Sequence, residues 1–529
     1  MAPDHAEAMQ AFSLHALEAT LHGTLGALNA YTECCGRHPP DALALRWSNA
    51  AGDAGTLTFG ALQDRAGRVA NLLAGAGVRP GDVVAGLLPR TPDLLAVALG
   101  TWRAGAVYQP LFTAFGPRAV AQRLRTSGAR IAVTNAANRA KLDEAPGLGQ
   151  VLLTGRDLDA ALAAQPTAFD TVPRTGDNPF LLMSTSGTTG LPKGVQVPLR
   201  ALLSFGAYMR QSVDLQPGDR FWNLADPGWA YGLYYAVVGP LLLGRATTFH
   251  DGPFTAASAV QVMQRQGITN LAGAPTAFRL LIADGGLAAL RGQLRVISSA
   301  GEPLNPEVIR WVQAHLGIPI MDHYGQTELG MVVCNHHGLR HPVRAGSAGV
   351  ALPGYRVVVL DDADAELPPG VPGVLAVDIA QSPLLWFDGY LGQPPLPATG
   401  YYRTGDTVEG EPGGGISFVG RADDIITSSG YRIGPFEVES ALVEHPAVME
   451  AAVVGRPDPE RTEVAVAYVV LTPGTEATPA LAEALQQHVR TRLSAHAYPR
   501  QVRFVPDLPK TPSGKLQRFV LRAQEREAG

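Results

Sequence analysis

The sequence lacks three features that would assign it to particular classes of protein. Its 529 residues contain no apolar run of about 18 residues, the length that a membrane-spanning helix requires. Cysteine is scarce, and Cys34, Cys35 and Cys334 are too few for a disulfide framework. Positive charge is not in excess, because 42 Lys and Arg stand against 47 Asp and Glu. These absences predict a cytoplasmic protein with no membrane span and no basic surface for nucleic acid.

Helix and strand patterns alternate along most of the chain, which is long enough for two or more domains. The apolar residues at 59, 62, 66, 69 and 73 are spaced by three and four, as on one face of a helix. Residues 1–50 are predicted to be mostly helical. Strands that alternate with helices imply parallel sheets covered on both faces. Short apolar runs predict buried strands at 83–88, 131–134, 180–183 and 294–299.

The pattern changes twice toward the C-terminal end. From Gly346 to about Gly420, short runs broken by Gly and Pro predict antiparallel strands in a β-barrel-like subdomain. Beyond Asp423, shorter segments predict a small α+β unit of about a hundred residues. We therefore expect an α/β fold. Residues 1–422 would form a large N-terminal domain of doubly wound sheets, and residues 423–529 a small, mobile C-terminal domain.

One stretch, from Ser184 to Gly194, reads STSGTTGLPKG and directly follows a predicted strand. Its glycines let backbone N–H groups approach an anion, its hydroxyls donate hydrogen bonds, and Lys193 adds a positive charge. It is not the common GxxxxGK[ST] loop, because Pro192 and Gly194 flank the lysine. A flexible linker is the alternative, but a linker seldom follows a buried strand. We predict a polyphosphate cradle formed by Thr185, Ser186, Gly187, Thr188, Thr189, Gly190 and Lys193.

This stretch resembles the signature loop of the adenylate-forming enzymes, which include acyl-CoA synthetases, luciferases and peptide-synthetase adenylation domains. The resemblance extends roughly from Asn29 to Arg522 and is strongest to the medium-chain acyl-CoA synthetases. It implies that a carboxylate attacks the α-phosphorus of ATP, that pyrophosphate leaves, and that coenzyme A then takes the acyl group. ATP, Mg²⁺ and coenzyme A are the implied cofactors. The implied catalytic residues are Lys515, Thr185 and Glu328.

Two segments beyond the loop, AGEP at 300–303 and DHYGQTELG at 322–330, match the family's adenine and magnesium motifs. The resemblance implies that Tyr324 stacks on adenine and that Thr327 contacts phosphate. Glu328 would ligate Mg²⁺, a hard cation that prefers oxygen. The other implied nucleotide contacts in these segments are Gly301, Glu302, Pro303, Asp322, His323, Gly325 and Gln326.

Further motifs extend the resemblance into the C-terminal region. Asp406, in YRTGD, is implied to bind both ribose hydroxyls, and Arg421, in GRADD, to lie near the nucleotide. Asp423 matches the hinge about which the small domain turns. Lys515, in PKTPSGK, would bridge the attacking carboxylate and the α-phosphate, where a cation stabilises the developing charge. Arg432 is a further implied nucleotide contact.

The second half-reaction of the family follows a large rotation of the small domain. The resemblance implies that Lys515 would then leave, and that a segment around Gly430 would line a tunnel for the pantetheine arm of coenzyme A. Three arginines lie where related medium-chain acyl-CoA synthetases have basic residues. The implied coenzyme A contacts are Ser429, Gly430, Tyr431, Arg461, Arg490 and Arg500.

The acid-binding pocket differs from that of acetate-specific relatives, in which a tryptophan precedes the QTE segment. This chain has Gly325, and the loss of an indole is expected to open the pocket, whereas Tyr231 narrows another wall. A medium-chain or aromatic acid is therefore favoured over acetate. The expected pocket residues are Trp229, Ala230, Tyr231, Gly232, Ala300 and Gly325.

Other functions stay open at this stage. The chain could load an acyl or aminoacyl group onto a carrier protein, although no carrier domain follows Gly529. It could be a short-chain (acetate or propionate) ligase, a luciferase-like oxygenase or a nucleotide sensor without catalysis. The presence of Glu328, Asp406 and Lys515 argues against a sensor. The expected partners are a carboxylic acid, ATP and coenzyme A, and the expected state is a monomer or homodimer.

Overall fold

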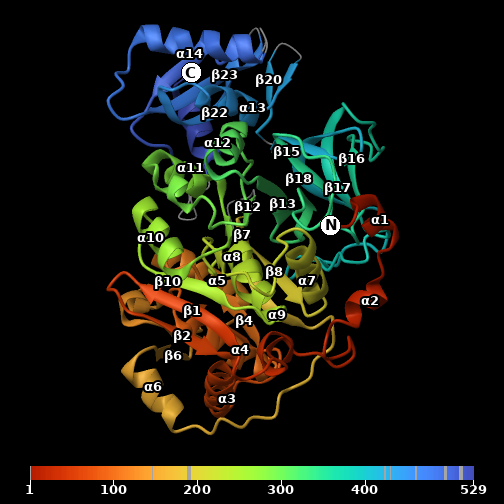
Figure 1. The fold of residues 1–529 in the computed structure, drawn as a ribbon, viewed down its shortest axis with the longest axis vertical. Helices are drawn as coiled ribbons and strands as arrows, with labels where there is room; N and C mark the ends of the chain where they lie inside the picture. The colour runs from red at the N-terminus through yellow and green to blue at the C-terminus, as the bar shows by residue number, and fades with distance from the viewer. Residues whose placement is uncertain are drawn as a thin grey trace.

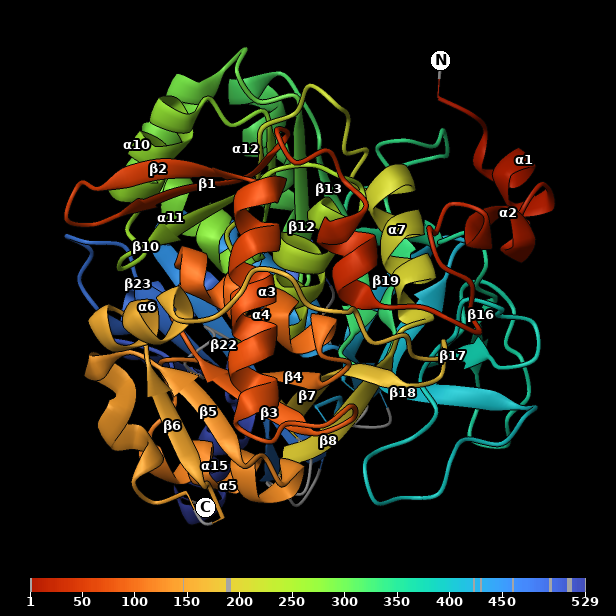
Figure 2. The ribbon, with the colours of Figure 1, turned by 90° about the horizontal axis from the view of Figure 1, so that it is seen from below.

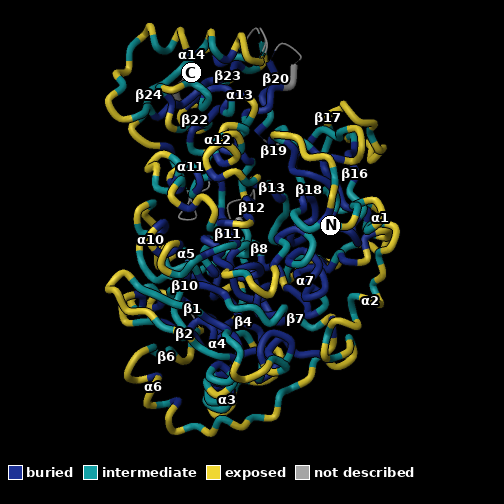
Figure 3. The backbone as a smooth tube through the Cα atoms, in the orientation of Figure 1, coloured by how far each residue is buried: buried dark blue, intermediate teal, exposed yellow. Residues whose placement is uncertain are grey.

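The computed structural model of the chain describes residues 2–145, 147–186, 192–421, 424–428, 431–458, 461–493, 497–510 and 516–528. Figure 1 shows an elongated molecule, with the C-terminal elements gathered at one end. The described residues form four sheets of three, ten, five and six strands. Buried backbone follows the central strands, and exposed backbone follows the outer turns and helices (Figure 3).

The six-stranded sheet carries the predicted phosphate loop at one end. Its strand order is β6-β5-β3-β4-β7-β8, with parallel pairing from β6 to β7 and an antiparallel last strand. The strands are β3 (Val83–Leu87), β4 (Val107–Pro110), β5 (Ile131–Thr134), β6 (Gln150–Leu153), β7 (Pro179–Ser186) and β8 (Pro192–Pro198).

Helices cover both faces of this sheet, as the alternating pattern predicted. On β3, Val84 packs in the core with α3 and α4, whereas Ala85 and Leu87 face the cluster that contains α5. Helices α3 and α4 lie side by side (Figure 2). The helices and turns of this region are α3 (Phe59–Gly75), α4 (Pro92–Arg103), α5 (Pro117–Ser127), η2 (Ala136–Leu142) and α6 (Arg156–Ala163).

The prediction of a mostly helical N-terminal segment is wrong for its last part. The first helices are α1 (His5–Gln10) and α2 (Leu14–Glu18), followed by the π-helix η1 (Thr32–Gly36). The chain then forms a strand that pairs in parallel with a strand about two hundred residues away in sequence. The three-stranded sheet consists of β1 (Leu43–Asn49), β2 (Ala54–Thr58) and β10 (Thr247–Asp251).

The ten-stranded sheet is parallel in one half and antiparallel in the other. Its order is β16-β17-β18-β19-β15-β14-β13-β12-β11-β9. The predicted antiparallel strands are present, and they continue this sheet because β15 pairs with both β14 and β19. The strands are β9 (Phe221–Asn223), β11 (Asn270–Gly273), β12 (Val296–Ala300), β13 (Ile320–Gln326), β14 (Gly330–Cys334), β15 (Ser347–Ala351), β16 (Val357–Leu360), β17 (Pro372–Asp378), β18 (Tyr401–Gly410) and β19 (Ile416–Arg421).

Two groups of helices cover the parallel half of the ten-stranded sheet. One face packs in a cluster with α10, α11 and α12, and the other face packs with α7 and η3 in the main core. The bounds are α7 (Ala201–Gln211), α8 (Ala230–Gly232), η3 (Leu233–Val238), α9 (Gly239–Leu242), α10 (Ala256–Gln266), α11 (Pro275–Asp284), η4 (Gly286–Leu290) and α12 (Pro306–Leu316).

The last part of the chain forms a sheet of its own, in the order β21-β20-β23-β22 with β24 beside β23. Its core is separate from the two larger clusters. The elements are β20 (Ile426–Ser428), β21 (Tyr431–Ile433), α13 (Pro435–Val443), β22 (Val448–Asp458), β23 (Thr462–Leu471), α14 (Pro479–Arg492), β24 (Gln501–Phe504) and α15 (Arg518–Ala528). Among the described helices, none combines the length and the apolar character that a membrane span requires.

Candidate active site

The predicted phosphate loop lies between two paired strands. Thr185 on β7 and Lys193 on β8 are register partners, and these two antiparallel strands lie at one edge of the six-stranded sheet. Lys193 is half-buried, and its Nζ lies 4.6 Å from the centre of the Tyr390 ring. Ser186 lies at the end of β7. Four predicted loop residues, Gly187, Thr188, Thr189 and Gly190, lie outside the described residues.

Two predicted nucleotide residues at the end of β13 converge on Asp406 of β18. The Tyr324 hydroxyl donates to Asp406 Oδ2 at 2.5 Å, and Gln326 Nε2 donates to the same oxygen at 2.9 Å. Burial, together with the Asp406 charge, raises the pKa of Tyr324 well above its usual value. The phenol therefore keeps its proton and acts as the donor. The structure thus joins the predicted adenine residue to the predicted ribose residue by a hydrogen bond.

Glu328 follows this strand and carries a buried carboxylate. Only 8% of the residue is exposed, and its Oε1 accepts a 2.8 Å hydrogen bond from the Tyr390 hydroxyl. The neighbouring Thr327 carbonyl accepts a bond from Tyr234 at 2.9 Å, which fixes the backbone. No group of three His, Cys, Asp or Glu side chains among the described residues could hold a metal by itself. A single carboxylate fits Mg²⁺, because this ion is commonly held by one or two carboxylates together with phosphate oxygens and waters.

The AGEP segment is tied to β13. Asp322 Oδ2 accepts from the backbone N–H of Leu304 at 3.3 Å, while its Oδ1 is buried and has no partner among the described residues. Burial raises the pKa of Asp322 well above its usual value. Glu302 accepts from the Thr276 hydroxyl at 2.7 Å. Gly301 has φ 95°, which favours glycine, and Pro303 follows one residue later.

His323, a predicted nucleotide contact, has a buried side chain. Its ring is only 2% exposed. Nε2 faces the Asn335 carbonyl at 3.0 Å and must donate, so Nδ1 accepts from the Tyr208 hydroxyl at 2.7 Å. Burial lowers the pKa of His323 to about 3. Both ring nitrogens are used, and the residue supports β13 from below.

The expected acid-pocket residues pack in two directions. Trp229 contacts Phe112 and Phe115, with ring centres 5.6 and 5.2 Å away. Tyr231 lies on the main core, with its ring centre 5.9 Å from that of Tyr235. Ala300 is fully buried in that core. Aromatic rings therefore surround the short helix α8, which contains the remaining expected residues, Ala230 and Gly232.

The expectation that the missing side chain of Gly325 opens the acid pocket is wrong. A Cβ atom there would lie 2.0 Å from the Gly330 carbonyl oxygen and 2.8 Å from Met331 Cα. The register of β13 and β14 shifts between Tyr324 and Gly325, and the two backbones meet at this shift. The backbone of β14 thus requires glycine at this position. The missing side chain does not leave an open volume.

Several predicted contacts of the C-terminal region lie outside the described residues, namely Asp423, Ser429, Gly430 and Lys515. Tyr431 and Arg432 belong to β21, where Arg432 pairs with Thr427.

Other predicted C-terminal contacts are described. Arg421 is the register partner of Asp406. Arg490 and Arg500 share one aromatic partner, with guanidinium carbons 5.7 and 4.2 Å from the centre of the Tyr498 ring. Arg461 follows β22, and its backbone N–H donates to Asp458. The structure therefore brings two of the three predicted coenzyme A arginines together.

Sequence reasoning missed Tyr390 and Tyr402. Tyr390 contacts both Glu328 and Lys193, and the Tyr402 hydroxyl donates to Gln326 Oε1 at 3.3 Å. Tyr390 lies in the apolar stretch WFDGYLG, where its spacing to the other motifs carries no signal. Only the fold brings this stretch to the site.

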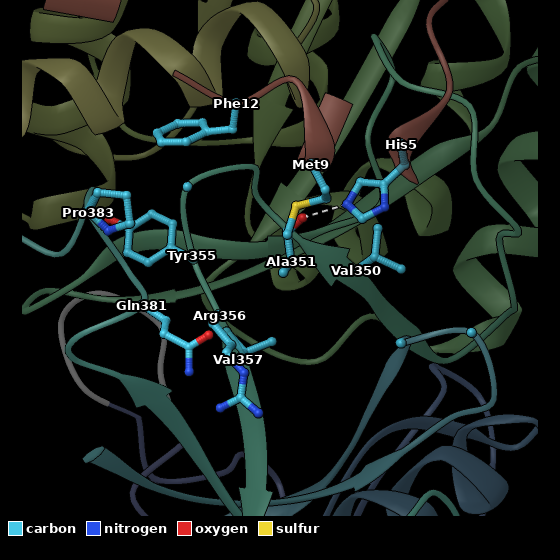
Figure 4. A pocket seen from close by; sticks show the side chains of 13 residues that line it. His5, Met9, Phe12, Val350, Ala351, Tyr355, Arg356, Val357, Gln381 and Pro383 are labelled. Atoms are coloured by element: carbon cyan, nitrogen blue, oxygen red, sulfur yellow. Dashed lines mark hydrogen bonds between the residues drawn. The ribbon is translucent and has the colours of Figure 1, made fainter. Parts of the chain in front are cut away.

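A separate pocket of about 410 Å³ lies between α1 and the antiparallel strands (Figure 4). His5, Met9 and Phe12 line one side, and Tyr355 and Pro383 line the other. None of the predicted site residues lines it. This pocket is therefore distinct from the candidate active site.

Comparison with known proteins gives two family matches. The model of the AMP-binding enzyme family matches residues 32–390, and that of the AMP-binding enzyme C-terminal domain matches residues 437–515. An acetyl-coenzyme A synthetase of Bacillus subtilis is 36% identical, over 94% of this chain and 91% of the relative. The human mitochondrial acyl-coenzyme A synthetase ACSM5 is also 36% identical, over 93% of this chain and 88% of the relative.

Solved structures are similar over nearly the whole chain. The crystal structure of Brucella canis acyl-CoA synthetase is 59% identical and covers 99% of both chains, with a TM-score of 0.80. A benzoate CoA ligase from Burkholderia xenovorans LB400 is 28% identical and has a TM-score of 0.83, covering 94% of this chain and 100% of that one.

The Lys193 ammonium, the buried Glu328 carboxylate and the Tyr324–Asp406 pair are groups of the kind that an enzyme activating its substrate with a nucleotide requires. The chain belongs to the AMP-binding enzyme family. Within that family it is an acyl-CoA synthetase, an AMP-forming ligase that uses ATP, Mg²⁺ and coenzyme A.

Proposed function

We propose that this acyl-CoA synthetase activates a medium-chain or aromatic carboxylic acid. In the first step an oxygen of the carboxylate attacks the α-phosphorus of ATP, pyrophosphate leaves and an acyl-adenylate forms. In the second step the thiol of coenzyme A attacks the acyl carbon, AMP leaves and a thioester forms. In this proposal Asp406 and Tyr324 hold the nucleoside, and Lys193 and Thr185 hold the phosphates. Glu328 holds Mg²⁺, which neutralises phosphate charge when it is bound.

The aromatic residues around α8 carry the proposal on acid size, because the backbone of Gly330 fills the space beside Gly325 and position 325 adds no volume. Ala300 adds no bulk, and the rings near Trp229 and Tyr231 are typical of an apolar site. The structural likeness to a benzoate CoA ligase also supports an aromatic acid as substrate.

The likeness to an acetyl-coenzyme A synthetase supports a second candidate, a short-chain ligase. An aminoacyl-adenylating enzyme is less favoured. Asp226, the acidic residue nearest Trp229 in sequence, already accepts from the Gly228 N–H at 2.8 Å and lies 3.8 Å from Arg90 Nε. Burial also raises the pKa of Asp226 above its usual value, which makes this carboxylate less suited to pair with a substrate ammonium group.

We also propose domain limits of 1–422 and 423–529, with the hinge at Asp423 and Lys515 as the first-step cation. The separate sheet and core of the last hundred or so residues support these limits. Arg490 and Arg500, held beside Tyr498, are proposed to attract the phosphates of coenzyme A. A monomer or homodimer in the cytoplasm is the proposed state.

The first test measures pyrophosphate release with ATP and Mg²⁺ for a series of acids, from acetate to decanoate and including benzoate. Each acid is assayed with and without coenzyme A, and product thioesters are identified by mass. We expect kcat/KM to be highest for an acid of four to ten carbons or for benzoate. A maximum at acetate would instead support the short-chain ligase. Adenylate formation without transfer to coenzyme A, combined with transfer to a carrier protein, would overturn the proposal.

A further inference from the structure

Tyr390 makes two different contacts with residues of the candidate active site. Its hydroxyl donates to Glu328 Oε1 at 2.8 Å, and its ring lies beneath the Lys193 ammonium at 4.6 Å. A carboxylate oxygen accepts, so the Tyr390 hydroxyl is the donor in this bond. One side chain thus holds an anion through its hydroxyl and a cation through the face of its ring.

The backbone around Tyr390 is fixed to the strand that leaves the phosphate loop. Tyr390 forms a β-bridge with Val195, and the Leu391 N–H donates to the Gly194 carbonyl at 2.8 Å. A Cβ atom at Gly194 would lie only 3.1 Å from Leu391 Cβ, so the two segments are in close contact. Tyr390 is therefore held in a constant position relative to Lys193.

Neighbouring rings hold the Tyr390 ring in place. The Phe387 ring centre lies 5.1 Å from that of Tyr390 and 5.5 Å from that of Tyr402. The Tyr402 hydroxyl in turn donates to Gln326, which donates to Asp406. Within this ring cluster, Tyr390 contacts the Glu328 carboxylate directly, and Tyr402 is connected to Asp406 through Gln326. A glutamate without such a partner would lose side-chain order, because its side chain has several free torsions.

We propose that Tyr390 is a positioning residue that sets the orientation of Glu328 relative to Lys193. It thereby couples the binding of the metal at Glu328 to the binding of phosphate at Lys193. The inference rests on the proposed role of Glu328 in the nucleotide site. Partners that orient a metal-binding side chain are worth about 10- to 100-fold in metal affinity or activity. The hydroxyl and the ring have separable tasks: the hydroxyl acts on Glu328, and the ring acts on Lys193.

The test compares Tyr390→Phe with Tyr390→Leu. Tyr390→Phe removes only the hydroxyl and keeps the ring, and we expect the Mg²⁺ concentration for half-maximal pyrophosphate release to rise about 10-fold or more. The KM for the acid is expected to stay within about 2-fold, since the acid does not depend on Glu328 orientation. Tyr390→Leu removes the ring as well, and the KM for ATP should then rise further, because Lys193 loses its cation–π partner. Thermal midpoints report whether the fold is retained.

A binding measurement separates positioning from turnover. Calorimetric titration of each variant with Mg²⁺ and a non-hydrolysable ATP analogue should show weaker binding for Tyr390→Phe without any reaction. Tyr401→Phe is the matched control. Tyr401 donates to the exposed Glu366 Oε1, also at 2.8 Å, and packs against a separate cluster. This variant should bind the magnesium–nucleotide pair as the natural protein does.

Three outcomes distinguish the possibilities. If Glu328→Gln weakens magnesium–nucleotide binding and Tyr390→Phe does not, the role of Tyr390 is overturned while the proposed function stands. If Glu328→Gln has no effect either, the assignment of Glu328 fails, and the inference fails with it. If Tyr390→Phe lowers the thermal midpoint but leaves Mg²⁺ dependence unchanged, Tyr390 is only a packing residue.

Discussion

At the residue scale, the glycine at position 325 has two possible explanations, an enlarged acid pocket or a close approach of two strands. The motif suggested that its missing side chain enlarges the acid pocket, whereas the structure places the β14 backbone where a side chain would begin. The same residue therefore serves the pairing of β13 and β14. The sequence shows that this position is glycine, but it does not show why glycine is needed. The reason is the register shift between β13 and β14, which depends on a strand partner.

Gly325→Ala is expected to destabilise the protein by about 1–3 kcal/mol, because the new methyl group must displace backbone and not a flexible side chain. The measurement is the free energy of unfolding from urea titration, followed by intrinsic fluorescence. Gly75→Ala is the matched control, since nothing lies within 4 Å of a Cβ at Gly75, in the last turn of α3. There the same change should be neutral or stabilising by about 0.5–1 kcal/mol. A stable Gly325→Ala protein with a shortened acid range would restore the pocket interpretation.

At the element scale, strands with local signals could be predicted and strands defined by distant partners could not. The residues at 59, 62, 66, 69 and 73 all lie on the buried face of α3, and the run at 131–134 coincides with β5. In contrast, β1 has no regular alternation of burial and is stabilised by pairing with β10, far along the chain. Local sequence preferences do not indicate a strand partner so far away in the chain.

The candidate site divides in a similar way. The motifs identified Tyr324, Gln326 and Asp406, and the structure joins them by hydrogen bonds. The motifs could not distinguish His323 from its neighbours, because a residue inside a motif can face away from the ligand. Tyr390 was missed for the opposite reason: it lies outside the motifs and reaches the site only through its contact with β8.

Two buried histidines, one on β13 and one after β14, are expected to make the fold sensitive to acid. Burial lowers the pKa of His323 to about 3 and that of His337 to about 4, and the His337 ring bonds the Ile297 carbonyl at 3.0 Å. In the unfolded chain these groups titrate near 6.5, so the unfolded state binds more protons below that pH. Stability is therefore expected to fall as the pH drops from about 6.5 toward 4. Between pH 7.5 and 5.5, each histidine should contribute a loss of about 1.4 kcal/mol.

Other groups titrate in the same pH range, and Asp322, whose pKa is raised, changes the stability in the opposite sense. A variant, His337→Gln, is therefore needed to isolate the contribution of one histidine. We expect the difference in unfolding free energy between pH 7.5 and 5.5 to shrink by about 1.4 kcal/mol in this variant. His15→Gln changes an exposed histidine on α2 and should leave the difference unchanged. An identical pH dependence in His337→Gln and the natural protein would contradict the assignment.

At the scale of the whole molecule, a few polar contacts join the C-terminal part to the rest. Asn305, at the start of α12, donates to Ser440 of α13 at 3.1 Å, and Arg310 of α12 bonds Glu444 at 3.2 Å. The ring centres of Phe418 and Phe436 are 6.3 Å apart. Contacts of this kind are weak enough to exchange, because exposed ion pairs contribute about 0–1 kcal/mol each. The interface is therefore compatible with the rotation that the proposed two-step reaction requires.

Fixing this interface should separate the two half-reactions. Arg310→Cys and Glu444→Cys place thiols where the exposed ion pair was, and a short reducible bis-methanethiosulfonate can join them. The natural cysteines should not interfere, since all three are buried and burial raises the pKa of Cys35 to about 12. We expect the linked protein to keep one half-reaction, either pyrophosphate release or thioester formation from added acyl-adenylate, and to lose at least about 10-fold in the other. Reduction should restore both, and the two single-cysteine variants should be unaffected by the reagent. If the linked protein completes both steps at the unlinked rate, the C-terminal part does not need to move, and the hinge assigned to Asp423 is wrong.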